Sequence, residues 1–364
     1  MITVGSLDPA SPDAPVAAHF GDPLREQRLT GALVDRTHRG VLRLTGPERL
    51  TFLHNITTQY LLDFPDLTAT QSLILSPHGH IEHHFWVTSI GDELWLDTEP
   101  GYVQGLEEFL LKMRFFTQVE ISLGGLNVYS LLGSTLDLPE PWIGDVPPAK
   151  FATGAVPNRA TSTYPVKALP GGGFARRTAL GTDLLLPPDA DPLAVTAALL
   201  AGRSSSGAAS LTAGKPDLSA AAGESGVQRA GIWAYEALRV AAGVPRLGFE
   251  TDHKTLPSEA GLTAVAVHLE KGCYRGQETV ARVHHLGRPP RSLRLLHLDG
   301  VMSDNLPAQG TPITSGDRTV GFIGTAVRHF EEGPIALGVL KQRISGDTPL
   351  VAGESTVAVE SSND

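Results

Sequence analysis

The stretch KGCYRGQET surrounds Cys273, the only cysteine of the chain. Gly272 and Gly276 permit a tight backbone path on either side of it. Lys271 and Arg275 flank the thiol, and nearby positive charge favours the thiolate, which is the reactive form of cysteine. These residues indicate a reactive thiol at a turn. Taken by themselves, they leave open a structural turn with an incidental cysteine.

The same stretch adds an aromatic ring and a hydrogen-bonding amide, in Tyr274 and Gln277. The candidate catalytic residues are therefore Lys271, Cys273, Tyr274 and Gln277. The residues that we expect to support them are Gly272, Arg275, Gly276 and Glu278.

A second polar cluster, HGHIEHH, contains four histidines and a glutamate. In a strand, His78, His80 and His84 would share one face with Glu82, whereas His83 would face the other way. Imidazoles at this spacing can bind zinc or iron. However, no cysteine joins them, and the strand continues directly into FWV. We therefore expect a polar strand, solvated or lining a channel, and no metal site.

The composition restricts the class of protein. One cysteine in 364 residues allows no internal disulfide, which fits a reducing compartment. It also means that the chain cannot hold an iron–sulfur cluster by itself, because such clusters need about four thiolates. The formal net charge of −10 argues against nucleic-acid binding. No apolar run approaches the roughly 18 residues that span a membrane. We expect a cytoplasmic protein without a membrane partner.

Several elements follow from the hydrophobic pattern. GVLRLTGPERLTFLHNIT indicates a strand followed by a helix, and the next 45 residues indicate three strands. VQGLEEFLLKMRFF and residues 226–242 have the spacing of amphipathic helices. Residues 1–23 are rich in Pro, Asp and Ala and suggest a disordered leader. Residues 203–224 suggest a flexible insertion, and 291–364 suggest a small all-β domain.

The motif around the cysteine resembles the signature of the YgfZ family, K-G-C-Y-x-G-Q-E. The residues that match its fixed letters are Lys271, Gly272, Cys273, Tyr274, Gly276, Gln277 and Glu278. The resemblance extends to LVDRTHRGVLRLTGPERLTFLHNITTQ, to LRVAAGVPRLG and to the C-terminal β segment. Its coverage is weakest over residues 130–225.

YgfZ proteins are paralogues of the glycine-cleavage T-protein, an aminomethyltransferase that uses tetrahydrofolate. The resemblance implies an α+β fold arranged as a three-lobed ring. Two interleaved α+β domains would occupy residues 24–290 and a β-barrel residues 291–364. It also implies that folate binds in a central channel and that the protein supports assembly or repair of iron–sulfur enzymes. Its partners would be those enzymes or cluster-assembly proteins, and the motif cysteine would matter for this role.

The chain departs from the T-protein pattern at two places. T-proteins carry paired aspartates where this chain has His83 and His84, and a glutamate where it has Ala241. A carboxylate is the group suited to a pterin N–H edge and a developing ammonium. The departures argue against aminomethyl transfer and favour a folate-dependent accessory protein. A reworked one-carbon transferase or demethylase, and a non-catalytic folate-sensing module, remain alternatives.

The resemblance also suggests folate contacts outside the motif. Trp233 stands where family members use a tryptophan against the folate, and an indole can stack on its rings. Arg239 would meet the glutamate carboxylates of the folate. His84 would contact the cofactor from the strand. The alternatives are a core aromatic ring for Trp233 and a surface arginine for Arg239.

Overall fold

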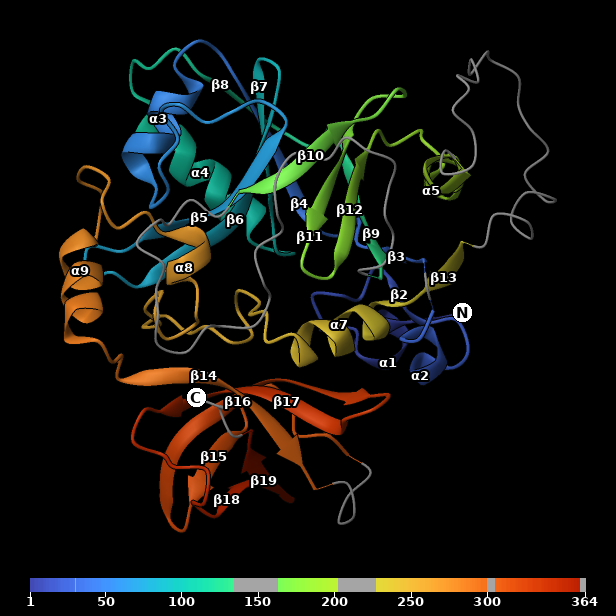
Figure 1. The fold of residues 1–364 in the computed structure, drawn as a ribbon, viewed down its shortest axis with the longest axis vertical. Coiled ribbons are helices and arrows are strands. Elements are labelled where there is room, and N and C mark those ends of the chain that lie inside the picture. The colour runs from blue at the N-terminus through green and yellow to red at the C-terminus, as the bar shows by residue number, and fades with distance from the viewer. Residues whose placement is uncertain (30, 134–162, 202–226, 300–304, 361–364) are drawn as a thin grey trace.

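The computed structural model describes residues 1–29, 31–133, 163–201, 227–299 and 305–360. The insertion predicted at 203–224 lies outside these residues. Within them the chain forms an eleven-stranded sheet assembly, the helices that cover it, and a closed six-stranded barrel (Figure 1). The α+β class and the C-terminal barrel are confirmed. No helix in the described ranges has the length and apolar character to cross a membrane.

One half of the sheet assembly carries the strand–helix unit predicted near the N-terminus. Its strands are antiparallel, in the order β5-β6-β7-β4-β8. They are β4 (Gly40–Thr45), β5 (Thr68–Leu75), β6 (Ile81–Ile90), β7 (Glu93–Thr98) and β8 (Glu120–Leu123). Helices α3 (Arg49–Ile56) and α4 (Val103–Arg114) bury their apolar sides against them around Leu53, Leu106 and Phe85. The predicted strands around the SPHG turn and the predicted helix α4 are confirmed.

The other half of the assembly contains strands from distant parts of the chain. They are β3 (Ala32–Asp35), β9 (Asn127–Leu132), β10 (Tyr164–Ala168), β11 (Phe174–Thr178), β12 (Gly181–Leu186) and β13 (Gln228–Ala230). Strand β10 pairs with β5 and so joins the two halves. Because β13 pairs in parallel with β3, a late segment completes the sheet beside an early one. Helix α5 (Pro192–Ala201) is capped by the Asp191 side chain.

The C-terminal third places three helices before the barrel. They are α7 (Ile232–Ala241), α8 (Thr263–Ala266) and α9 (Gln277–Leu286). The barrel strands are β14 (Arg291–Leu298), β15 (Pro312–Ser315), β16 (Arg318–His329), β17 (Gly333–Lys341), β18 (Leu350–Ala352) and β19 (Ser355–Val359). Figure 1 shows α7 between the sheet assembly and the barrel. The helix predicted over 226–242 is shorter because its first residues form β13.

The prediction of a disordered leader over 1–23 is wrong. This segment forms β1 (Ile2–Thr3), α1 (Val4–Leu7), β2 (Ala17–His19) and the start of α2 (Pro23–Glu26). Val4, Val16 and Ala18 are buried in a core shared with β3 and α7. Asp13 forms an ion pair with Arg246. The composition of the segment did not indicate this order because some of its partners, Arg246 and the residues of α7, lie more than 200 residues away in the sequence.

Candidate functional site

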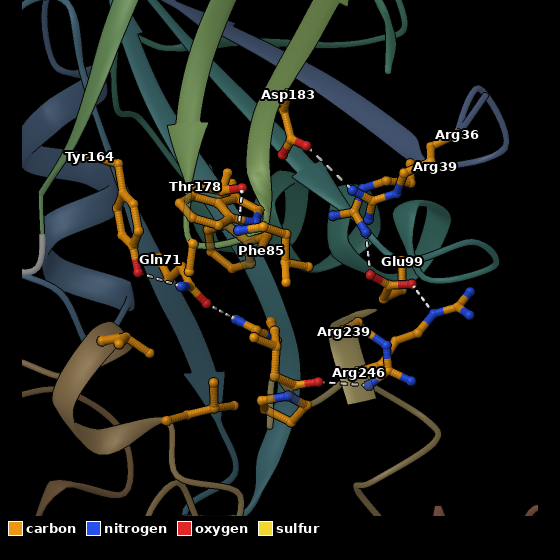
Figure 2. A pocket seen from close by; sticks show the side chains of 18 of the residues that line it. Arg36, Arg39, Gln71, Phe85, Glu99, Tyr164, Thr178, Asp183, Arg239 and Arg246 are labelled. Atoms are coloured by element: carbon orange, nitrogen blue, oxygen red, sulfur yellow. Dashed lines mark hydrogen bonds and ion pairs between the residues drawn. The ribbon is translucent and has the colours of Figure 1, made fainter. Parts of the chain in front are cut away.

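A cavity lies where the two halves of the sheet meet α7 and α8 (Figure 2). It holds about 880 Å³ of space free of protein atoms, its open mouth included. Its walls come from the β3–β4 turn, β5, β6, β10, the β11–β12 turn, α7 and the segments after α7.

One side of the cavity is aromatic and neutral. His84 Nε2 lies 2.8 Å from Gln71 Oε1, and Gln71 Nε2 donates a hydrogen bond to the Tyr164 hydroxyl at 2.9 Å. Burial lowers the pKa of His84 to about 4, so its imidazole is neutral at pH 7. The Trp86 ring meets the Tyr164 ring edge to face at 4.6 Å. The Arg176 guanidinium lies over the Trp86 ring, 4.1 Å from its centroid. This side of the cavity offers aromatic side chains and uncharged hydrogen-bonding groups.

The other side of the cavity is charged and closely paired. Asp97 lies behind the wall between two arginines, with Arg39 Nη2 at 2.8 Å and Arg176 Nη1 at 2.7 Å. Burial would raise the pKa of Asp97, but the two guanidinium groups outweigh it and hold the pKa at about 2. Glu99 accepts hydrogen bonds from Arg39 and from Arg246 Nε, the latter at 2.6 Å. Most charges here neutralise one another rather than face a ligand.

Arg36 is held differently from these arginines. It follows β3 directly, and its backbone N–H donates to the carbonyl of Val128 at 3.0 Å. Its Nη1 donates to Ser130 Oγ at 2.9 Å and lies 3.5 Å from Asp183 Oδ1. The guanidinium lies over the Tyr235 ring, 4.0 Å from its centroid. The side chain is therefore fixed in the cavity wall through Nη1.

The structure separates the three predicted folate contacts. His84 lines the cavity, as does Arg239. However, every N–H of the Arg239 guanidinium already has a partner. Those partners are Glu236, Glu250, the Val244 carbonyl and the Thr325 hydroxyl. Arg239 therefore connects α7 to the barrel strand β16. Its guanidinium has no free donor for a ligand carboxylate, although the sequence suggested such a contact.

Trp233 does not line this cavity. It lies in the first turn of α7, is 40% exposed, and has its ring 5.3 Å from that of His19. The tryptophan in the cavity wall is Trp86. The strand alternation that was used for His84 places Trp86 two residues later on the same face, so that signal was present in the sequence. Gln71 lies directly across from Trp86 on β5.

The histidine cluster divides between three places. His84 points to the cavity, and His83 packs on the other face of β6 beside Phe109 of α4. Strand β6 begins at Ile81, so His78 and His80 lie in the preceding turn rather than on a common strand face. Among the residues that the structure describes, no three His, Cys, Asp or Glu side chains are grouped to hold a metal ion.

The cysteine motif forms a loop docked against the turn before β6. Gly276 has φ +82°, and a Cβ there would lie 2.6 Å from the Ser76 carbonyl oxygen and 2.8 Å from Gly79 Cα. The glycine is needed for both the conformation and the close approach. Arg275 pairs with Glu82 at 3.1 Å, and both side chains are partly exposed. These contacts fix the loop on the sheet.

The side chains of the motif divide into buried and exposed sets. Lys271 is buried, and its ammonium donates to the backbone carbonyls of His54, Thr57 and Gln59 at the end of α3. Tyr274 is a buried core residue, and burial raises the pKa of its hydroxyl. The exposed set comprises Gly272, Cys273, Arg275 and Glu278.

This placement changes the expected role of Lys271. The sequence suggested a lysine beside the thiol, but the ammonium is instead bound by three carbonyls beneath the loop. Gln277 Nε2 donates to the Lys271 carbonyl at 3.1 Å and closes the loop on itself. Lys271 and Gln277 therefore hold the loop in shape, and Cys273 is presented to solvent.

The comparisons with known proteins agree with this architecture. No family model matches the chain. An aminomethyltransferase of Pelodictyon phaeoclathratiforme is 26% identical over 342 residues, which cover 89% of this chain and 83% of that protein. The tRNA-modifying protein YgfZ of Aliivibrio fischeri (strain MJ11) is 34% identical over 130 residues, covering 34% of this chain and 39% of that protein.

Among solved structures, the glycine cleavage system aminomethyltransferase T from Bartonella henselae matches with a TM-score of 0.71. The match covers 97% of this chain and 92% of the other, at 18% sequence identity. At that identity the likeness establishes the fold.

Proposed function

We propose that this chain, which is similar to aminomethyltransferases and to YgfZ proteins, is a tetrahydrofolate-binding accessory protein. In this proposal it supports the assembly or repair of iron–sulfur enzymes, and its partners are those enzymes or cluster-assembly proteins. An exposed thiol suits a reducing compartment such as the cytoplasm.

The observation that carries the proposal is the pairing of a suitable cavity with a separate, exposed thiol. The residues of the cavity fit a folate. Trp86 and Tyr164 offer aromatic side chains, Gln71 offers an amide, and Arg36 offers cationic donors. When bound, a tetrahydrofolate supplies a carrier for one-carbon units. The protein's part is to hold a flat, amide-edged molecule between aromatic side chains and to keep water from it.

The neutral His84 bears on the reaction. An ammonium that forms during aminomethyl transfer would need a nearby anion. His84 offers an uncharged ring at the cavity wall, and the carboxylates that line the cavity, Glu99 and Asp183, are already paired with arginines. This supports an accessory role over aminomethyl transfer. A reworked transferase or demethylase would instead show turnover of a methylated or aminomethylated amine by the purified protein with tetrahydrofolate.

In the proposed mechanism Cys273 carries the iron–sulfur function. Its loop is fixed by Gly276, Gln277 and the Arg275–Glu82 pair, so the thiol is presented at a constant position on the surface. There it acts either as a relay for an electron or a persulfide, or as a ligand to iron shared with a partner. A cluster held entirely by this chain is excluded because it has one cysteine.

The function is tested in a strain that lacks the gene. Under oxidative stress, the activity of iron–sulfur enzymes such as an aconitase should fall several-fold in extracts. Wild-type protein should restore it and Cys273→Ser should not, although both fold equally well because this side chain is exposed. Glu270→Gln, which changes an exposed residue just outside the motif, is the matched control. Full restoration by Cys273→Ser would refute the thiol mechanism.

The cavity is tested separately by tryptophan fluorescence. We expect tetrahydrofolate to quench the emission of the wild-type protein, because a ligand in the cavity lies beside Trp86. Trp86→Phe should remove most of the quenching and weaken binding about tenfold, the order expected for losing a stacking partner. Trp233→Phe should leave both the quenching and the affinity for tetrahydrofolate unchanged. Quenching that depends on Trp233 and is indifferent to Trp86 would place the folate elsewhere.

A further inference from the structure

Arg36 differs from the other arginines of the cavity in its unused donors. The guanidinium groups of Arg39 and Arg239 are each bound by two carboxylates, and that of Arg246 is bound by three. In Arg36 only Nη1 has polar partners, Ser130 and Asp183. Nε and Nη2 have no hydrogen-bond partner among the residues that the structure describes, although the side chain is only 7% exposed. A buried cation with unused donors indicates that something else meets them.

The unused donors form one edge of the guanidinium. Nε–H and one N–H of Nη2 are parallel, which is the geometry that receives a carboxylate through two hydrogen bonds. Tyr235 lies against a face of the group, with its ring centroid 4.0 Å from Cζ. Because Ser130, Asp183 and Tyr235 already hold the side chain, little rotamer entropy would be lost when an anion binds there.

The surroundings favour a singly charged ligand group. Asp183 and Glu99 lie in the same wall of the cavity as Arg36, and their carboxylates would repel a dianionic phosphate more strongly than a carboxylate. Figure 2 shows Arg36 and Asp183 on the side of the cavity opposite Tyr164 and Gln71. The neutral, ring-binding side and the unused guanidinium edge therefore face a ligand from two directions.

We propose that Arg36 binds a carboxylate of the cavity ligand through Nε and Nη2, and thereby turns the ring system of the ligand toward Gln71, His84 and Trp86. This inference rests on the proposed folate function and specifies it. The ligand class is a pterin that carries an anionic tail, and the tail is bound by Arg36 rather than by Arg239.

The test is isothermal titration calorimetry with two matched ligands. One is 5-formyltetrahydrofolate, and the other is its diamide, in which both glutamate carboxylates are carboxamides. The wild-type protein should bind the acid about 10- to 100-fold more tightly than the diamide, the range expected for a charge-assisted pair. Arg36→Met should bind both equally, at the wild-type affinity for the diamide. Arg36→Lys, which keeps the charge without the fork, should retain part of the preference.

The outcomes separate the two proposals. If the wild-type protein binds acid and diamide equally tightly, the role of Arg36 is refuted while folate binding stands. If Arg36→Met and Arg36→Lys weaken both ligands by the same factor, Arg36 only shapes the cavity, and the inference also fails. If neither compound binds, the folate proposal falls and this inference falls with it. Arg282→Met, which removes an exposed arginine of α9, should behave like the wild-type protein.

Discussion

Asp97→Asn should lower the free energy of unfolding by about 3–5 kcal/mol, the usual effect of breaking a buried ion pair. Asp97 is 1% exposed and lies between Arg39 and Arg176, each of which would keep a buried charge with only one of its two carboxylate partners. An asparagine has nearly the same shape, so the loss would reflect charge rather than packing. Urea-induced unfolding, followed by circular dichroism, measures it.

An exposed ion pair of the same strand, β7, provides the control for Asp97→Asn. Glu93→Gln breaks the Arg43–Glu93 pair at the other end of the strand, where both side chains are substantially exposed. That change should cost less than about 1 kcal/mol. If the two variants lose equal stability, the buried network does not stabilise the fold in the way we describe.

The pH dependence of this contribution follows from the lowered pKa of Asp97. The folded-state pKa is about 2, against 3.8 for an unperturbed aspartate, because Arg176 and Arg39 outweigh the opposing effect of burial. The unfolded state therefore takes up a proton first as the pH falls. The stability difference between wild-type protein and Asp97→Asn should be constant from pH 7 to about pH 5. It should then shrink as the pH falls from about 4 toward 2.

Lys271→Met should lower the free energy of unfolding by about 3 kcal/mol. The methionine fills similar space but leaves three buried carbonyls, those of His54, Thr57 and Gln59, without their donor. The pKa of Lys271 is lowered to about 8 by burial, so the ammonium that makes these bonds is still charged at pH 7. Lys254→Met, at an exposed lysine, should change stability by less than about 0.5 kcal/mol.

This variant also separates two roles for the lysine. If Lys271 stabilised a neighbouring thiolate, its removal would slow alkylation of Cys273 by iodoacetamide at pH 7 and leave the fold intact. The structure predicts the reverse, namely a loss of stability and a thiol that reacts as fast or faster because its loop is loosened. Unchanged stability with slowed alkylation would contradict the structural role.

Local patterns in the sequence were enough to predict the elements around the site. The strands β5, β6 and β7, the helix α4 and the C-terminal barrel follow from periodicity and turn residues, which depend on neighbours within a few positions. Gly276 could be assigned to a tight backbone path because a glycine beside a functional residue usually serves the backbone. The face of the strand on which His84 lies could also be predicted, because side chains alternate between the two faces of a strand.

The charged partners could not be predicted in this way. Arg36 meets Ser130, Arg246 meets Asp13, and Lys271 meets the end of α3, each across about 90 residues or more. No local pattern specifies such pairs. Arg239 is partly an exception, because Glu236 stands three residues before it on the same helix face and is its partner. That spacing could have indicated a paired arginine rather than a free one.

The way in which the N-terminal segment is held has a consequence for the order of folding during synthesis. Asp13 can pair with Arg246 only after Arg246 has been synthesised. The same holds for Glu26 with the backbone N–H of Gly231, and for β3 with its parallel neighbour β13. At ribosomal rates of roughly 5–20 residues per second, these partners emerge on the order of 10 to 50 s after the segment itself. During that interval Val4, Val16 and Ala18 lack much of the core that buries them in the finished protein. These apolar side chains of the nascent chain therefore stay incompletely buried until α7 has been made.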